Sequence, residues 1–431
     1  MLRFIFLTLF VSSRLFASTT PETYTETLPN GVRIILQQDH TKPRVAVTTL
    51  VRTDFFPQKN YGVSHLVQHL LMSGKPSDEL HDLKKAMKIN TNASLVEDAA
   101  WFDADMPRSA LPAYLKANRT QLGSLDTSKP LMEGCKEEMD QEYSKQFADG
   151  FLPVAAGTLK SRMFEEPTYA FGTQGPTEFV NMVTPELVNE YYLNNFRASS
   201  ITLSIVGDFE TKDVLAIIRK EWANYPETRV DKPAFQYFNL YKPLDQYTVR
   251  VKLPEDRVLI ALGYEIPDSR HTDTAAMDVL IELLESPKGV GSFAESKLKG
   301  KVSETLAANY LTLRPHVLVL AADGKVKVDA DELRAGLISA LQNVVTNPES
   351  KDWEKAREGA IEKFLTRNSD RMDLARNLAI YDVFYGSYLS YYGRVEEYKK
   401  VTFHDLQRVI YTYFLSKKPH ELIIRRELDP I

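Results

Sequence analysis

The chain has 431 residues, of which 43% are hydrophobic and 26% are charged, and its formal net charge is −5. This composition is typical of a globular protein, and the length exceeds what one compact core normally holds, so we expect at least two domains. A slightly acidic balance argues against a protein that binds nucleic acid or anionic membranes. The single cysteine, Cys135, excludes an internal disulfide framework and a cysteine-based zinc site.

The first 17 residues have the features of a secretory signal peptide. Arg3 precedes the apolar run FIFLTLFV at 4–11, and the small residue Ala17 offers a cleavage position. The apolar run is too short to span a membrane. A mitochondrial transit peptide is the rival interpretation, because Arg3 and Arg14 lie in an acid-free stretch, but the run is apolar all round rather than amphipathic. We therefore expect residues 1–17 to be removed and the mature protein to be periplasmic or secreted.

The first half of the chain alternates strand and helix patterns after a turn signal at 28–31. Predicted strands, rich in β-branched residues, lie at 32–36, 45–51, 99–106 and 200–206. Predicted helices cover 61–73, 80–87, 111–122, 130–147, 185–193 and 214–222. The strand at 99–106 alternates as an edge or half-buried strand does. Together these elements form an N-terminal unit over 24–225.

A proline-containing, charged and aperiodic stretch at 226–238 is predicted to be a linker. Beyond it the order of elements repeats over 239–431. Predicted strands lie at 247–253, 258–264, 306–313, 317–322 and 421–425, and predicted helices at 272–284, 330–345, 352–366, 372–384 and 403–414. The tyrosine-rich stretch 381–398 is interpreted as a packing helix and turn. We predict an α+β protein of two similar halves, each of single-domain size.

The segment YGVSHLVQHLLMS at 61–73 holds the main functional signal. His65 and His69 are four residues apart, so they face the same side of a helix. Two imidazoles in this arrangement can hold one zinc ion, as in the patterns H-E-x-x-H and H-x-x-E-H. The spacing alone is also compatible with a chance pair on a buried helix. The sequence therefore leaves a metal site and a packing role open at this point.

The flanking residues resemble the pitrilysin-like (insulinase-type) M16 metallopeptidases. GVSHLVQHLLMSGK is similar to their zinc helix, G-x-x-H-x-x-E-H-x-x-x-x-G-T, and the stretch NASLVED at 92–98 is similar to their N-A-x-T-x-x-D segment. Further similar segments follow in the family's order, at 169–173, 183–197 and 206–209. The resemblance implies two homologous lobes, each a mainly antiparallel sheet covered by helices. It also implies zinc as the cofactor and Asn92 and Ala93 as substrate-binding residues.

The family takes its third zinc ligand from a glutamate on a later helix. The resemblance places that helix at 130–147, where Glu142 follows His69 by 73 residues and Glu138 is the alternative one turn earlier. Cys135 stands where the family often has a second glutamate. The alternative is that the glutamates of this helix bind no metal and form a solvated acidic face. Given the resemblance, we favour His65, His69 and Glu142 as the metal ligands.

Gln68 stands where the family has its general-base glutamate. A carboxylate there takes a proton from the zinc-bound water, whereas an amide has no useful basicity near neutral pH. Because Gln68 is not a ligand, zinc binding could survive while catalysis falls by about 10²–10⁴. The resemblance therefore predicts a degenerate catalytic site.

A second departure concerns the second half of the chain. Active relatives carry an R-x-x-x-x-x-x-Y pair that binds substrate and stabilises the oxyanion. The similar stretch here offers Lys297 with Glu304, or Lys299 with Leu306 in the alternative register. Neither register supplies the tyrosine, and a lysine lacks the planar fork of arginine.

Three functional hypotheses follow from these departures. The favoured one is an exported, catalytically degenerate M16 protein that forms a homo- or heterodimer with another M16 chain and holds a peptide, with strand addition expected at 99–105. The second is an active zinc endopeptidase in which another carboxylate, such as Glu138, replaces the base. The third is a mitochondrial processing-peptidase or respiratory core-like subunit, which depends on a transit peptide at the N-terminus.

Overall fold

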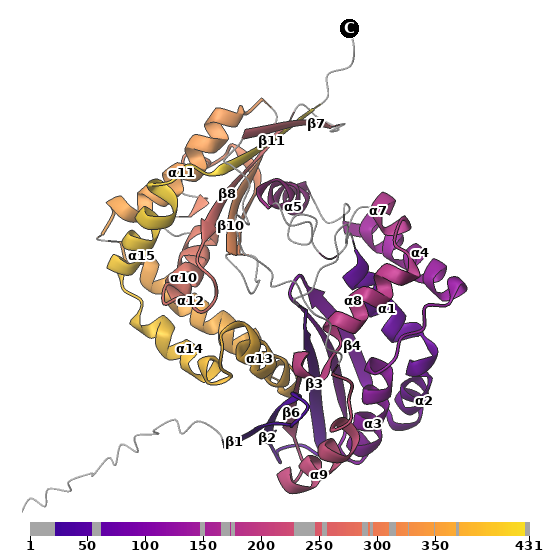
Figure 1. Cartoon of the computed structure of the whole chain (residues 1–431). Helices are drawn as coiled ribbons and strands as arrows, with labels where there is room; N and C mark the ends of the chain where they lie inside the picture. Colours follow the sequence, from indigo (N-terminus) through magenta and orange to yellow (C-terminus); the bar gives the residue numbers. More distant parts are fainter. Residues whose placement is uncertain are drawn as a thin grey trace, which may run out of the picture.

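Two β-sheets, one in each half of the chain, organise the fold (Figure 1). The structure is a computed structural model, and it describes residues 22–53, 62–146, 151–164, 173, 177–227, 246–251, 257–286, 292–293, 296–309, 316–325, 327–348, 350–367 and 370–426. The predicted signal peptide 1–17, linker residues 228–238 and most of the segment 169–173 lie outside these ranges.

The first sheet has six strands in the order β1-β2-β6-β3-β5-β4. Only β2 and β6 pair in parallel; the other neighbours are antiparallel. The strands are β1 (Thr23–Thr27), β2 (Arg33–Gln38), β3 (Arg44–Arg52), β4 (Asn90–Val96), β5 (Ala99–Pro107) and β6 (Ile201–Gly207). The central strands β3 and β6 are almost completely buried, which explains their continuous run of β-branched and apolar residues.

The second sheet repeats this plan with five strands in the order β7-β11-β8-β10-β9. Its one parallel pair is β7 with β11, at the position that β2 and β6 occupy in the first sheet. The strands are β7 (Gln246–Val251), β8 (Val258–Ile266), β9 (Val302–Asn309), β10 (His316–Gly324) and β11 (His420–Arg426). The prediction of an α+β fold with two similar lobes and mainly antiparallel sheets is confirmed.

The predicted position of the edge strand was wrong. The strand at 99–107 pairs on one side with β3 and on the other with β4, so its backbone groups are already used. Among the described strands, the edge on this side of the sheet is β4, whose polar sequence NTNASLV gave no clear strand pattern. A peptide that adds a strand on this side would therefore pair with 90–96 and not with 99–105.

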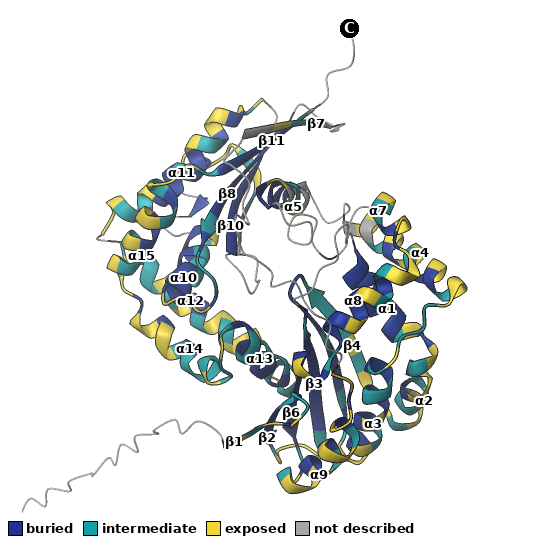
Figure 2. Cartoon of the chain, viewed as in Figure 1, coloured by how far each residue is buried: buried dark blue, intermediate teal, exposed yellow. Residues whose placement is uncertain are grey.

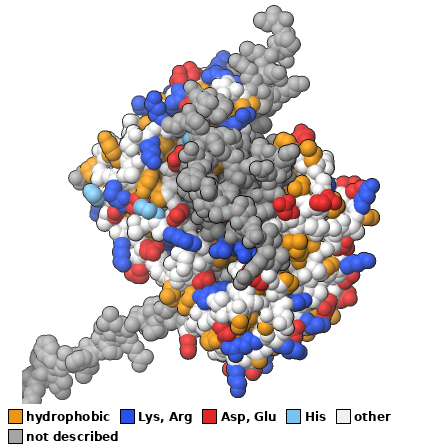
Figure 3. Space-filling model, in the orientation of Figure 1, with side chains coloured by type: hydrophobic (Ala, Val, Ile, Leu, Met, Phe, Trp, Pro, Cys, Tyr) orange, Lys and Arg blue, Asp and Glu red, His pale blue; other side chains and the backbone are white. Residues whose placement is uncertain are grey.

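Helices cover the outer face of each sheet, and their exposed sides face solvent (Figure 2). The first lobe has α1 (Val63–Ser73), α2 (Asp78–Met87), α3 (Leu111–Leu122), α4 (Lys129–Gln146), α7 (Thr177–Asn181), α8 (Pro185–Asn195) and α9 (Thr211–Trp222). The second has α10 (Thr274–Glu285), α11 (Ala330–Thr346), α12 (Asp352–Arg367), α14 (Leu389–Lys400) and α15 (Phe403–Ile410). Acidic and basic side chains are interspersed on the face in Figure 3. Among the described helices, none has the length and hydropathy needed to cross a membrane.

The two lobes exchange one helix each. Helix α5 (Phe151–Met163) comes from the first half of the chain but packs on β8, β10 and β11 of the second sheet. Helix α13 (Arg371–Phe384) comes from the second half and packs on β3, β5 and β6 of the first sheet. Figure 1 shows α5 beside the second sheet and α13 beside the first. Each sheet is thus sandwiched between its own outer helices and one helix from the other half.

Polar contacts reinforce the exchange. The guanidinium of Arg376 on α13 donates to the buried carboxylate of Asp103 on β5 at 2.8 Å, and the hydroxyl of Thr48 donates to the same group. Arg33 on β2 pairs with Asp382 at 3.2 Å. Burial raises the pKa of Asp103, while Thr48 and Arg376 act in the opposite direction. These charge-assisted contacts join the two halves of the chain.

Candidate metal centre

Helix α1 presents the histidine pair on a rigid, buried element. It begins after Gly62, whose φ of +80° is readily adopted only by glycine, and it ends where the N–H of Gly74 donates to the carbonyl of Leu70. Its apolar side chains lie in the core of the first lobe, among them Val63, Leu66, Val67, Leu70 and Leu71. This packing fixes the direction of His65 and His69, which are one turn apart.

Helix α4 packs against α1 and supplies the carboxylates. Its buried residues Met132, Cys135 and Met139 follow the three- and four-residue spacing of one helix face. Glu142 is the next residue on that face, three positions after Met139, so the packing that seats α4 also carries Glu142 to the histidines. Burial raises the pKa of the Cys135 thiol to about 11, so this residue is a packing group and not a thiolate ligand.

The structure brings His65, His69 and Glu142 together. The Nε2 atoms of the two histidines are 3.1 Å apart, and the Glu142 carboxylate oxygens lie 3.3 Å from His65 Nε2 and 3.7 Å from His69 Nε2. The three donor groups lie within 4.8 Å of one another. Ligands 2.0–2.1 Å from a tetrahedral zinc ion are about 3.3 Å from each other. The donor set, two imidazoles and one carboxylate, therefore fits zinc in both chemistry and spacing.

Glu138 occupies a second position in this site. Its Oε2 atom is 3.1 Å from Nδ1 of His69, the ring nitrogen that faces away from Glu142. A carboxylate in this place orients the imidazole and leaves Nε2 for a metal. The sequence had offered Glu138 as an alternative ligand; the geometry groups Glu142 with both Nε2 atoms and Glu138 with His69 alone.

The environment of His65 keeps its ring neutral. Burial, with a smaller contribution from His69, lowers the pKa of His65 to about 4. A neutral imidazole has a free lone pair, which is the form that binds a metal. Its Nδ1 is buried and has no hydrogen-bond partner among the described residues.

Comparisons with known proteins agree with the fold. Residues 182–360 match the family described as "Peptidase M16 inactive domain". This part of the chain therefore matches the M16 peptidase family. Bovine cytochrome b-c1 complex subunit 1 (Bos taurus, mitochondrial) is 24% identical over 220 residues, which is 49% of this chain and 44% of that protein. The chain thus spans less than half the length of this curated relative.

Two bacterial matches, one to a curated protein and one to a solved structure, cover a larger share of the chain. Zinc protease PqqE of Helicobacter pylori is 21% identical over 343 residues, covering 76% of each chain. The crystal structure of a protease from Helicobacter pylori superposes with a TM-score of 0.82 at 18% identity, covering 94% of this chain and 99% of the other. At this identity the superposition establishes the shared fold.

Gln68 lies on α1 directly before His69. Its side chain is 6% exposed, and its Nε2 atom has no hydrogen-bond partner in the described part of the chain. A buried amide donor without a partner is uncommon and costs stability, so this position is not explained by packing alone. The amide can bind water or a substrate carbonyl, but it cannot accept a proton at neutral pH.

The predicted substrate-binding residues lie on one of the two edge strands of the first sheet. Asn92 and Ala93 are in β4, opposite Asp103 and Phe102 of β5. Helix α1 contacts β4, so the edge strand runs beside the helix that carries the histidines. The structure therefore places Asn92 and Ala93 on a strand that contacts the helix with the histidines, although they were predicted to precede the edge strand.

The second-lobe candidates do not form an Arg/Tyr pair. Lys297, Lys299 and Glu304 are exposed, and Leu306 packs partly against the α5 cluster. Neither register places a tyrosine there. Among the described residues of this stretch, no side chain supplies the combination of a planar cation and a phenol hydroxyl that would stabilise an oxyanion.

Proposed function

We propose that this chain is an exported M16-family protein that has lost peptidase catalysis and acts as a non-catalytic partner or peptide-holding subunit while retaining a zinc-binding site. The observation that carries the proposal is Gln68, which lies between His65 and His69 on a helix otherwise suited to zinc. The site keeps its candidate ligands and lacks the group that moves the proton.

The residues of the site divide into three roles in this proposal. His65, His69 and Glu142 would hold zinc, and Glu138 would orient His69. Bound zinc acidifies a water molecule and polarises a carbonyl group. Gln68 can donate or accept a hydrogen bond beside that water, but it cannot take up the proton that must reach the leaving amine.

Peptide holding is supported by the free edge of β4. Backbone pairing along 90–96 needs no particular side chain, and it would place an added strand beside α1. The similarity to a protein named as a complex subunit favours a role in an assembly. We propose a dimer with another M16 chain as the form in which the peptide is held.

The purified mature chain should not cleave unfolded peptides in a chelator-sensitive manner. The measurement is the rate of cleavage of a fluorogenic unfolded peptide, with and without a zinc chelator, over a range of protein concentrations. The expected result is a rate equal to the background without protein. Chelator-sensitive turnover by the unmodified chain would contradict the loss of catalysis.

Metal content tests the zinc site separately. Elemental analysis of the purified chain should find about one zinc per chain, because three donors at suitable spacing remain. His65→Ala removes one of the two imidazoles and should lower the zinc content below about 0.1 per chain. His404→Ala, an exposed histidine on α15, is the matched control and should leave it unchanged. A wild-type chain without zinc would show that the helix at 63–73 is maintained by packing alone.

Two alternatives remain as competing hypotheses. An active endopeptidase would need a substitute base, and Glu138 is the nearest candidate; its contact with His69 Nδ1 argues for an orienting role instead. A mitochondrial core-like subunit is favoured by the similarity to cytochrome b-c1 complex subunit 1. N-terminal sequencing of the mature protein distinguishes it from the exported form, because cleavage after residue 17 is expected only for a signal peptide.

A further inference from the structure

The core of the first lobe contains a set of uncharged polar side chains that leads to α1. Thr49 on β3 and Asn118 and Gln121 on α3 are 0%, 0% and 1% exposed. The two amides lie on the buried face of α3, among apolar residues such as Leu115 and Leu122. Asparagine is a poor helix former, and a buried amide costs free energy unless it is hydrogen-bonded. Apolar side chains would serve packing better at these two positions.

Hydrogen bonds connect these groups in one direction. The hydroxyl of Thr49 donates to Oδ1 of Asn118 at 2.7 Å, and Nδ2 of Asn118 donates to Oε1 of Gln121 at 3.2 Å. Nε2 of Gln121 donates to the carbonyl oxygen of Leu71 at 3.2 Å and lies 3.5 Å from Sδ of Met72. Each side-chain nitrogen and oxygen of the three residues therefore has a partner, and we call this set the Thr49–Gln121 network. A fully satisfied buried network favours one arrangement of the elements that it joins.

The network reaches α1 at a carbonyl that the helix cannot pair by itself. The last four carbonyl groups of an α-helix have no partner within the helix, and α1 ends at Ser73. Leu71 is two residues after His69, so the bond from Gln121 holds the turn that follows this histidine. Apolar packing is non-directional, whereas a hydrogen bond restricts both the distance and the angle between two elements. The network thus ties α1 to α3 and to the sheet at β3.

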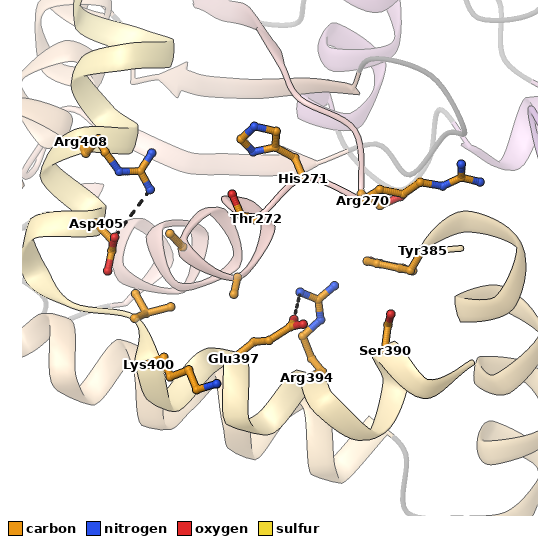
Figure 4. Close-up of a pocket in the computed structure, with 14 residues that line it drawn as sticks. Arg270, His271, Thr272, Tyr385, Ser390, Arg394, Glu397, Lys400, Asp405 and Arg408 are labelled. Carbon is orange, nitrogen blue, oxygen red and sulfur yellow. Dashed lines mark hydrogen bonds and ion pairs between the residues drawn. The ribbon is translucent and has the colours of Figure 1, made fainter. Parts of the chain in front are cut away.

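Ion pairs beside the cavity of the second lobe show a different use of polar groups. Arg394 donates to Glu397 at 2.9 Å, and Arg408 lies 3.6 Å from Asp405 (Figure 4). Both pairs have the three-residue spacing of one helix face, so they fix side chains within α14 and within α15. The Thr49–Gln121 network, by contrast, is uncharged and joins three elements. Its last bond is made to the helix that carries the candidate metal ligands.

We propose that Asn118 and Gln121 are positioning residues, which fix α1 and thereby set where His65 and His69 hold their imidazoles. This inference rests on the zinc-binding function proposed above. The two Nε2 atoms are 3.1 Å apart, and Glu142 reaches them from α4, so a rotation of α1 would change all three separations. A metal site needs its donors held within about 0.5 Å of the productive geometry. A directional network in the core supplies that restraint.

The test compares the full-length wild type with Gln121→Met and a matched control, Tyr225→Phe. Gln121→Met keeps the length of the side chain and removes the donor to Leu71. The buried hydroxyl of Tyr225 donates to the carbonyl oxygen of Leu122 at 2.6 Å, in the same core but away from α1. Each variant therefore loses a buried hydrogen bond to a helix carbonyl, and urea titrations should show a similar loss of stability in both.

Two measurements distinguish positioning from general stability. Gln121→Met should raise the dissociation constant for zinc about tenfold, measured by competition with a chromogenic chelator. In the metal-free chain it should also shift the imidazole nitrogen resonances of His65 and His69 in the NMR spectrum. Tyr225→Phe should leave the zinc affinity and these resonances unchanged. Thr49→Val removes the first donor of the network with little change in volume, and it should raise the dissociation constant about threefold.

Unchanged imidazole resonances in Gln121→Met would overturn the proposal. So would equal effects of Gln121→Met and Tyr225→Phe, because they would show a general loosening of the core. If Gln121→Met does not fold, unchanged resonances and zinc affinity in Thr49→Val overturn the proposal instead. A wild type that binds no zinc would contradict the function proposed above, and the resonances of the metal-free chain would then decide the positioning role by themselves.

Discussion

Gln68→Glu should gain chelator-sensitive peptide cleavage at about 100-fold the background rate expected for the unmodified chain. The new carboxylate would be next to His69 on α1, where it can take a proton from the acidified water and pass it to the leaving amine. General-base catalysis contributes about 10²–10⁴. We expect the low end of that range because Lys297 and Glu304, or Lys299 and Leu306, do not supply the Arg/Tyr pair that would stabilise the oxyanion.

The measurement compares initial rates on an unfolded fluorogenic peptide for the unmodified chain and Gln68→Glu, loaded with zinc to the same content. The double variant His65→Ala/Gln68→Glu should show no gain, because it keeps the new carboxylate and loses a metal ligand. Gln141→Glu adds the same charge at an exposed position of α4 and should leave the rate at the wild-type level.

Two outcomes would contradict this interpretation of Gln68. If Gln68→Glu binds zinc and shows no gain over an inactive wild type, the glutamine is not the main defect. If wild type is already active and the variant is no faster, another carboxylate acts as the base.

The positions of most strands and helices could be predicted because their patterns are strong. The strand at 45–51 and the helices at 111–122 and 330–345 have long apolar runs or clear helical periodicity, and the structure has β3, α3 and α11 there. Strand β4 was missed because its polar residues lack alternation, and the edge position was assigned to 99–106 in its place. Pairing on both sides of β5 depends on residues far away in the chain, which a local pattern does not contain.

Helix α5 was not predicted for a different reason. Its sequence FLPVAAGTLKSRM contains Pro153 and Gly157, which disfavour a helix locally. The apolar residues Leu152, Leu159 and Met163 are stabilised by packing on the second sheet, more than 90 residues later in the chain. Tertiary packing outweighs local propensity here.

The metal site was predicted in part. The sequence proposed His65, His69 and Glu142 as ligands and left Glu138 as an alternative. In the structure the first three lie close together, and Glu138 contacts Nδ1 of His69. The separate position of Glu138 could not be inferred from spacing, because it depends on the rotation of α4 about its axis. That rotation is fixed by the buried Met132, Cys135 and Met139.

Lys160→Met should lower the free energy of unfolding by about 3–5 kcal/mol. Lys160 on α5 forms a buried ion pair with Glu97, in the turn between β4 and β5, and the two residues are 6% and 8% exposed. Removing the ammonium group leaves a buried carboxylate without its cation. Loss of one partner destabilises a protein more than replacement of both partners by uncharged residues of similar volume. The measurement is a urea titration followed by circular dichroism and tryptophan fluorescence.

The double variant Glu97→Gln/Lys160→Met separates the charge from the packing. It removes both charges and keeps similar volumes, so it should recover at least about 1 kcal/mol relative to Lys160→Met alone. Lys145→Met, an exposed lysine on α4, should change stability by less than about 0.5 kcal/mol. If Lys160→Met lowers the free energy of unfolding by less than about 1 kcal/mol, Glu97 is solvated by water or paired with another cation in the variant. Lys160 is on α5, which covers the second sheet, whereas Glu97 belongs to the first sheet and directly follows β4. A large loss of unfolding free energy in Lys160→Met would therefore show that this ion pair links the two lobes. The link lies beside the edge strand that we propose for peptide binding.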